Sequence, residues 1–169
     1  MPRAFTGQSG RLPATVTFRP ITDADLKFLY ELYASTRADE LAQVDWTSEQ
    51  KSQFLTMQFN AQHSFYKEQF VKAQFLIIED DDKPVGRVYV DRRADEIRLI
   101  DIALLPGQRN SGLGTALLKD LLDEGQSSGL PVKIHVESFN PAIRLYHRLG
   151  FKPVEDQGVY QLMEWRPET

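Results

Sequence analysis

Residues 105–115 combine the residue types that bind a phosphate group. Gly112 and Gly114 carry no side chain, so backbone N–H groups there can approach a ligand closely. The segment joins an apolar stretch to an expected helix, and the free N–H groups at a helix N-terminus favour an anion. Thr115 adds a hydroxyl donor, and Arg109 adds a charge-assisted hydrogen bond. The spacing therefore predicts an anion site, most naturally for phosphate.

Two common phosphate-binding motifs do not fit this segment. Gly107 and Gly112 have the spacing of a P-loop, but Leu113 and Gly114 stand where Lys and then Ser or Thr are required. A Rossmann fingerprint requires Gly or Ala three residues after the second Gly, where Leu117 stands. A glycine-rich strand-to-helix turn that binds nothing is the alternative interpretation of the same residues.

A second segment, residues 140–151, has the start and stop signals of a helix and one residue that these signals leave unexplained. Asn140 and Pro141 suit a helix N-terminus, and Gly150 suits a C-terminal cap. Ala142 lies one turn before Tyr146 on the same helix face. A small residue at that position leaves room for a thin ligand beside the phenol.

Together the two segments resemble the GNAT family of N-acetyltransferases. Residues 109–114 read Arg-x-x-Gly-x-Gly, like the family's acetyl-CoA loop, and residues 140–151 resemble its Asn-x-x-Ala-x-x-Leu-Tyr-x-x-x-Gly-Phe element. The segments stand in the family's order, and the resemblance covers residues 75–151 well. There is one departure, because the family often has Asn where Phe139 stands. Asn140 is one residue late, which indicates a shortened or re-aimed loop.

The resemblance implies acetyl-CoA as cosubstrate, with no metal. It implies direct transfer of the acetyl group to a primary amine of a small molecule or peptide, through a tetrahedral intermediate. A backbone N–H near the end of the third strand of the sheet would stabilise the oxyanion, and Tyr146 matches the family's general acid. The cofactor contacts would come from Ile102, Ala103, Leu104, Arg109, Asn110, Ser111, Gly112, Leu113, Gly114, Thr115, Asn140 and Tyr146.

Such a reaction also needs a general base, because an amine with a pKa of about 10 is mostly protonated at pH 7. His135 and Glu137 alternate with the apolar residues of an expected strand over 132–136, so both point to one face. Imidazole has an ordinary pKa of about 6.5, which makes His135 the first candidate and Glu137 the second. A histidine that merely lines the strand is an equal alternative. Glu96 and Asp101 are further candidates, and Asp101 would need a partner if buried.

Hydrophobic patterns place these residues on a sheet with helices around it. A helix is expected to begin at Thr22, with others over 47–70, 112–124 and 141–149. Residues 79–82 are acidic and predict a solvated hairpin turn in preference to a metal loop. The order β-α-α-β-β-β-α-β-α-β predicts an α/β fold, as one GNAT-like domain over 14–169 after a flexible tail over 1–13, with a central mixed, mostly antiparallel sheet. Strands are expected over residues 15–19, 75–78, 84–91, 96–105, 132–136 and 159–165.

Composition limits the remaining possibilities. The 169 residues suit one domain, and 0 Cys excludes disulfides, Cys-ligated zinc and a thiol acyl-enzyme. The net charge of −4 argues against nucleic acid as a partner. No run approaches ~18 apolar residues, and residues 1–13 lack a signal-peptide pattern, so we expect a cytoplasmic protein without a membrane partner. The expected assembly is a monomer or a homodimer.

Two other functions use the same motifs. A catalytically silent acyl-CoA-binding sensor would have the same loop, and a non-enzymatic interaction domain would bind no acetyl-CoA. The acceptor is not specified by the sequence. Asp39, Glu40 and Asp45 would suit a cationic amine, and a solvated acidic surface explains them equally well.

Overall fold

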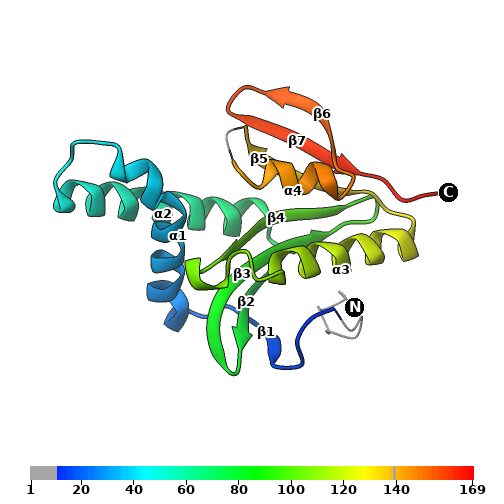
Figure 1. Cartoon of the computed structure of the whole chain (residues 1–169), viewed down its shortest axis with the longest axis horizontal. Coiled ribbons are helices and arrows are strands. Elements are labelled where there is room, and N and C mark those ends of the chain that lie inside the picture. The colour runs from blue at the N-terminus through cyan, green and yellow to red at the C-terminus, as the bar shows by residue number, and fades with distance from the viewer. Residues whose placement is uncertain (1–10, 139) are drawn as a thin grey trace.

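A twisted sheet runs through the molecule with strand order β1-β2-β3-β4-β5-β7-β6 (Figure 1). The computed structural model describes residues 11–138 and 140–169. Over these residues, β4 and β5 form the one parallel pair, and all other neighbouring strands are antiparallel. The predicted mixed, mostly antiparallel sheet is therefore confirmed. The strands are β1 (Val16–Pro20), β2 (Gln74–Asp80), β3 (Lys83–Arg92), β4 (Ile97–Leu104), β5 (Val132–Glu137), β6 (Lys152–Gln157) and β7 (Tyr160–Trp165).

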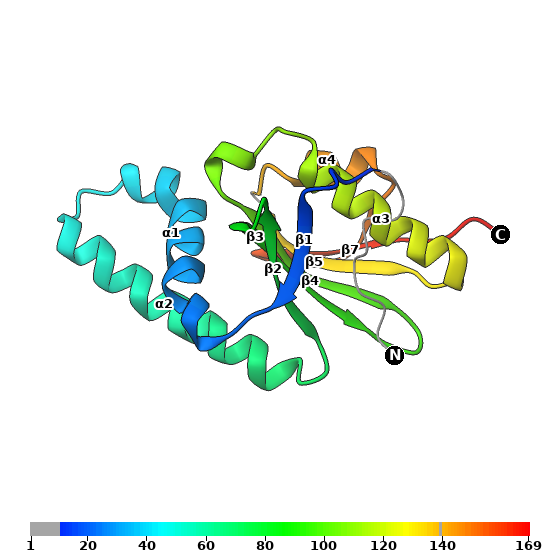
Figure 2. The same ribbon diagram turned by 90° about the horizontal axis from the view of Figure 1, so that it is seen from below.

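Helices cover both faces of the sheet, as two views at right angles show (Figures 1 and 2). Helices α1 and α2 pack against the face that carries Ile77, whereas α3 and α4 pack against the face that carries Leu76 and Ile78. Thr47 begins α2 with a capping box to Gln50. The helices are η1 (Asp23–Asp25), α1 (Leu26–Ala42), α2 (Ser48–Gln69), η2 (Pro106–Gln108), α3 (Leu113–Ser128) and α4 (Ile143–Arg148), of which η1 and η2 are 3-10 helices.

Helix α3 buries the apolar stripe that its sequence predicts, and it continues past its predicted end. The sequence predicts that Gly125 and Gly129 end the helix, but Gly125 lies inside α3, where an added Cβ would stand 2.8 Å from the Trp165 ring. The helix ends at Gly129, which has a φ of +72°. Close packing on β7 therefore explains Gly125. The buried stripe consists of Leu113, Leu117, Leu118, Leu121 and Leu122.

Strand β6 was not predicted from the sequence. Each of its residues is exposed, and it pairs only with β7, at the edge of the sheet. Because no face of β6 is buried, it lacks the alternation that identifies a strand in a sequence. Lys152, Glu155 and Asp156 also place charge along this open edge, which discourages pairing with another chain.

The acidic hairpin turn predicted between β2 and β3 is confirmed. Asp81 and Asp82 have φ values of 51° and 64°, in the left-handed region that a tight two-residue turn requires. Most of the predicted N-terminal tail lies outside the described residues. Within its last residues, Leu12 is buried in the core and Arg11 pairs with Asp120, so the folded domain includes both.

A bulge in β4 and the separation of β4 from β5 shape the centre of the sheet. The partners Val90↔Leu99 and Tyr89↔Asp101 leave Ile100 as an extra residue in β4. Asp101 therefore faces α2 instead of the core. The pairing of β4 with β5 ends at Leu99↔Ile134, and the strands diverge beyond it (Figure 1). The space between residues 100–104 and 135–137 is called the strand opening below.

Candidate functional site

The N-terminus of α3 has the geometry of an anion site. Gly112 precedes the helix with a φ of +88°, and an added Cβ on Gly112 or Gly107 would meet nothing within 4 Å. The first helical hydrogen bond runs from Ala116 N to Gly112 O at 2.9 Å. The backbone N–H groups of residues 113–115 precede this bond and therefore have no partner within the helix. Bare backbone facing open space at a helix N-terminus fits a pyrophosphate group.

The loop before α3 is held by side-chain contacts. Arg109 donates from Nε to the Leu104 carbonyl at 3.1 Å and from Nη2 to Ser35 Oγ at 3.1 Å. Ser111 Oγ donates to the Gln108 carbonyl at 2.6 Å, and Asn110 has a φ of +62°. Arg109 thus connects the loop to both β4 and α1. The hydroxyl of Ser111 is engaged within the loop.

The end of β4 presents backbone groups to the strand opening. Leu105 N donates to Val85 O at 2.9 Å, so Leu105 points toward β3. N–H and C=O groups alternate sides along a strand, so those of Leu104 point the other way, toward β5. The Leu104 carbonyl accepts the hydrogen bond from Arg109 on that side. Ile102 lies on the core face and Ala103 pairs with Arg87 of β3.

Tyr146 is buried beside the strand opening. Its side chain is 4% exposed, in the cluster that contains Ile134 and Val136, and its ring meets Phe151 edge-on at 5.6 Å. Burial raises the pKa of Tyr146, and the charge of Asp101 acts in the same direction. The phenol is therefore protonated at neutral pH and can serve as a hydrogen-bond or proton donor.

Asn140 has a structural contact of its own. Its Oδ1 accepts from Ala142 N at 2.9 Å, at the start of α4. Helix α4 is shorter than the predicted span of 141–149, because residues 141 and 142 form a turn before it. Phe139, the residue at the departure from the family pattern, lies outside the described residues.

The two base candidates on β5 have different surroundings. His135 is exposed, and its Nδ1 lies 3.2 Å from Arg98 Nη1. Partial desolvation and the Arg98 guanidinium lower the pKa of His135, so the ring is neutral at pH 7. Glu137 accepts hydrogen bonds on both carboxylate oxygens from Arg37 of α1, at 2.9 and 3.3 Å. Glu137 is thus engaged in a bidentate ion pair, whereas His135 lies beside Arg98 and has the side chain of Gln157 as a hydrogen-bond partner.

Asp101 has the partner that its sequence context required. Arg87 of β3 is 4% exposed, and its Nε donates to Asp101 Oδ2 at 2.6 Å. Arg87 Nη2 also donates to Gln62 Oε1 of α2 at 2.9 Å. The sequence contained a signal for this pair, since Arg87 interrupts an apolar strand. That arginine is not among the site residues predicted from the sequence.

The remaining candidates lie elsewhere. Glu96, directly before β4, pairs with Arg98 at 3.0 Å, far from the end of the strand that faces the loop.

Among the described residues, no group of three or more His, Cys, Asp or Glu side chains could hold a metal ion. In that same part of the chain, no helix is long and apolar enough to cross a bilayer.

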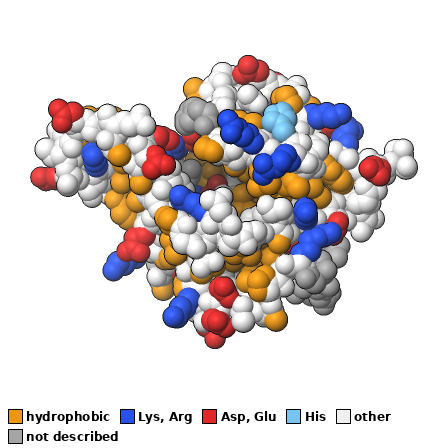
Figure 3. Space-filling model, in the orientation of Figure 1, with side chains coloured by type: hydrophobic (Ala, Val, Ile, Leu, Met, Phe, Trp, Pro, Cys, Tyr) orange, Lys and Arg blue, Asp and Glu red, His pale blue; other side chains and the backbone are white. Residues whose placement is uncertain are grey.

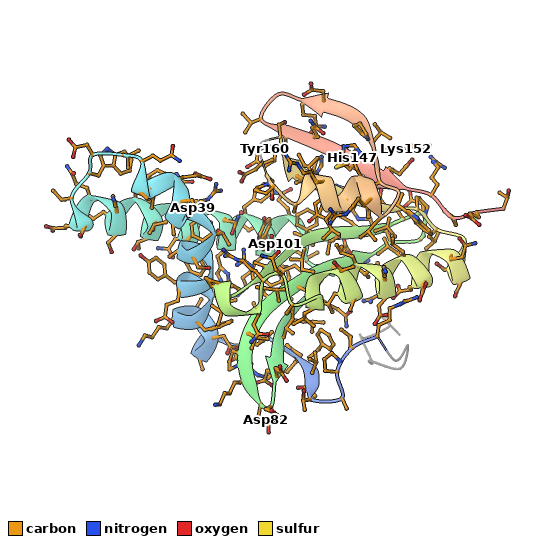
Figure 4. The ribbon with its side chains drawn as sticks, viewed as in Figure 1. Asp39, Asp82, Asp101, His147, Lys152 and Tyr160 are labelled. Carbon is orange, nitrogen blue, oxygen red and sulfur yellow. The ribbon has the colours of Figure 1, made fainter. Side chains whose placement is uncertain are left out.

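The elements around the strand opening form one concave region. In the space-filling view the surface is hollowed between the α1–α2 arm and the part that carries α4 (Figure 3). Asp101 lies near the middle of the molecule, between that arm and the β6–β7 hairpin that carries Tyr160 (Figure 4). The structure thus brings the α3 N-terminus, the end of β4, Tyr146 and Asp101 together at one opening in the sheet.

A sheet whose adjacent parallel strands separate beside a glycine-rich helix N-terminus is the architecture of an acyl-CoA-dependent transferase domain. Residues 26–151 match the family model described as the acetyltransferase (GNAT) family. The chain therefore belongs to the GNAT family of acetyltransferases.

Several solved structures of acetyltransferases have similar folds. The PaiA N-acetyltransferase from Thermoplasma acidophilum, in complex with coenzyme A, has a TM-score of 0.66 at 18% identity, over 89% of this chain and 98% of that chain. An acetyltransferase from Thermus thermophilus gives 0.63 at 17% identity, over 90% and 97%. The ribosomal-protein-S18-alanine N-acetyltransferase from Escherichia coli gives 0.60 at 21% identity, over 91% and 95%. At these identities the likeness shows a common fold.

Proposed function

We propose that this protein transfers an acetyl group from acetyl-CoA directly to a primary amine. The observation that carries the proposal is the strand opening, which lies next to an anion site built from backbone N–H groups. A cofactor with a pyrophosphate and a thin thioester arm requires both features side by side. The buried phenol of Tyr146, in the cluster at the edge of the opening, supplies a proton donor.

On the cofactor side, this chain's own residues fit the ligand. The N–H groups of residues 113–115 would bind the pyrophosphate, with Thr115 Oγ1 as a further donor. The loop residues Arg109, Asn110 and Ser111 would surround it. The edge of β4 at residues 102–104 would bind the amides of the pantetheine arm, and Asn140 would lie on the opposite side of the opening. Acetyl-CoA supplies the activated acetyl group when bound.

In the chemical step, three groups of the chain would act on the reacting atoms. The backbone N–H of Leu104 points into the strand opening and would stabilise the oxyanion of the tetrahedral intermediate. Tyr146 would give a proton to the departing thiolate. His135, neutral at pH 7 because its pKa is lowered, would accept the proton of the amine directly or through water. We favour His135 over Glu137 because Arg37 occupies both oxygens of Glu137.

The decisive experiment measures acetyl-CoA binding and amine turnover on the same samples. Wild-type protein is titrated with acetyl-CoA and then assayed with a panel of primary amines by thiol release. We expect binding and turnover in the wild type, and for Tyr146→Phe unchanged binding with a kcat lower by roughly 100-fold. Binding without turnover on any amine would instead support an acyl-CoA sensor. Absence of acetyl-CoA binding would leave only an interaction domain.

A further inference from the structure

The carboxylate of Asp101 has one oxygen engaged and one oxygen open. Arg87 contacts Oδ2 through both Nε and Nη2, each at 2.6 Å. Within residues 11–138 and 140–169, no hydrogen bond or ion pair reaches Oδ1. The side chain is 25% exposed, whereas that of Arg87 is 5% exposed. A buried arginine therefore fixes the carboxylate in place while its second oxygen faces accessible space.

This open oxygen lies where an acceptor must enter. The bulge at Ile100 turns Asp101 toward the α1–α2 face of the sheet, and β4 has no pairing with β5 at this level. The cofactor loop and Tyr146 lie on the other side, in the core with α3 and α4. An amine that approaches from the α1–α2 side would thus pass Asp101 before it reaches a thioester held in the strand opening.

Aromatic side chains lie on the same face of the sheet as Asp101, whose register partner in β3 is Tyr89. Tyr66 of α2 meets Tyr89 of β3 edge-on, with ring centroids 5.9 Å apart. Burial raises the pKa of Tyr66, and the charge of Asp101 acts in the same direction. Tyr160, on the β6–β7 hairpin, is 46% exposed, and its charge also raises the pKa of Tyr66. Aromatic faces beside a carboxylate attract an alkylammonium group.

Two arginines on the α1–α2 side, Arg37 and Arg87, are already paired. The guanidinium of Arg37 contacts Glu40 at 3.1 Å and Glu137 at 2.9 Å, and that of Arg87 contacts Asp101 and Gln62. A carboxylate on the acceptor, next to its amine, would meet Asp101 and Glu137 and would have to displace one of these pairs. Placing an acceptor carboxylate beside these carboxylates would disfavour binding, because like charges repel.

We propose that Asp101 Oδ1 binds the acceptor as a protonated primary amine, that Tyr66 and Tyr160 contact its stem, and that the site selects amines whose amine-bearing carbon has no carboxylate. The inference rests on the proposed function and adds the acceptor class to it. Asp101 acts here as a binding residue. The ammonium gives up one proton, to His135 or to water, before its nitrogen attacks the acetyl carbon. When the tetrahedral intermediate collapses, the nitrogen loses a second proton to solvent, and the departing thiolate takes a proton from Tyr146, which regains one from solvent. The carboxylate of Asp101 is unchanged.

Agmatine and arginine provide the test, because they differ only in a carboxylate on the carbon that carries the amine. Steady-state kinetics with acetyl-CoA should give a kcat/KM for agmatine at least about 10-fold above that for arginine. Asp101→Asn should raise the KM for agmatine by about 10- to 100-fold, since a charge-assisted hydrogen bond is lost. The Kd of acetyl-CoA should stay unchanged. Glu124→Gln is the matched control, since Glu124 also pairs with a β3 arginine, Arg92, but from α3.

Two further measurements keep the outcomes distinct. Asp101→Asn leaves Arg87 without its counter-charge, so Tyr66→Leu, which keeps the ion pair, is assayed beside it and should also raise the KM for agmatine. Calorimetric titration of agmatine into the complex with CoA measures binding without turnover. Equal use of arginine and agmatine, or an unchanged KM in both variants, would overturn this inference while leaving acetyl transfer intact. Agmatine binding that depends on Asp101, without turnover, would support the inference and refute the proposed function.

Discussion

The two sides of the strand opening are built from different kinds of groups. On the α3–α4 side, one continuous segment, residues 105–115, presents backbone N–H groups and bare glycine. On the α1–α2 side, side chains from separate elements meet in ion pairs: Arg37 with Glu137, and Arg87 with Asp101. Backbone groups are the same in any sequence that folds this way, whereas the paired side chains belong to this chain. The first side therefore suits a fixed cosubstrate, and the second side suits a selected acceptor.

The largest expected effect is a loss of acetyl-CoA affinity, caused by a substitution that disturbs only the α3–α4 side of the strand opening. Gly112→Val would place a side chain in the open space at the α3 N-terminus, at a φ of +88°. We expect the affinity for acetyl-CoA, measured by calorimetric titration, to fall at least about 100-fold, which corresponds to roughly 2.7 kcal/mol.

Gly158→Val is the matched control for this change. Gly158 has a φ of +81° and equally open surroundings, but it lies in the turn between β6 and β7. Gly158→Val introduces the same backbone strain but lies outside the anion site. The acetyl-CoA affinity of this variant should therefore equal that of the wild type. Equal loss in both variants would mean that strain, and not ligand contact, explains the result.

The next effect is expected on catalysis, at His135 on the α1–α2 side of the strand opening. Because the pKa of His135 is lowered, the acidic limb of the pH–rate profile should have its midpoint below the ordinary value of about 6.5. Activity is then retained at lower pH than an unperturbed histidine would allow. His135→Ala should remove this limb and lower kcat/KM by roughly 100-fold.

The pH–rate profile of an Arg98 variant tests the role of His135 more directly. Arg98→Met removes a guanidinium that lowers the pKa of His135, so the acidic limb should move to higher pH while the maximal rate changes little. His147→Ala, on the outside of α4 (Figure 4), should leave the profile unchanged. A profile that is identical in wild type and Arg98→Met would show that His135 is not the base.

The smallest expected effect concerns stability on the α1–α2 side. Arg19 holds Asp25, at the start of α1, through two hydrogen bonds of 2.8 Å, and these chiefly lower the pKa of Asp25 from 3.8 to about 2. Because the folded-state pKa is the lower one, this stabilisation is present above pH 3.8 and is lost as the pH falls through about 2. It corresponds to about 2 kcal/mol.

Asp25→Asn should therefore lower the free energy of unfolding in urea at pH 7, and the difference from wild type should vanish near pH 2. Asp39→Asn, on the exposed side of α1 (Figure 4), is the control and should change stability little. A constant difference between wild type and Asp25→Asn from pH 7 to pH 2 would contradict the assigned pKa.

The sequence predicted the buried stripe of α3 and the glycine loop because each is a local pattern within one element. It did not predict β6, which has no buried face and hence no alternation. It correctly named Gly129 at the end of α3 but also placed Gly125 there, because packing of Gly125 against the distant Trp165 leaves no signal in the local sequence. It also left open the choice between His135 and Glu137, which depends on Arg37 from another element.

The sequence by itself determined the family, the element order that positions the loop, and the identity of Tyr146 as the residue to test. These follow from short-range spacing, since helix periodicity and glycine placement act over a few residues. Only the tertiary structure decided that Asp101 faces α2, because a single bulge residue, Ile100, reverses the alternation of β4. Only the tertiary structure decided that Arg87 pairs with Asp101 and that Arg37 pairs with Glu137. Those pairs join strands and helices whose contact is created by folding.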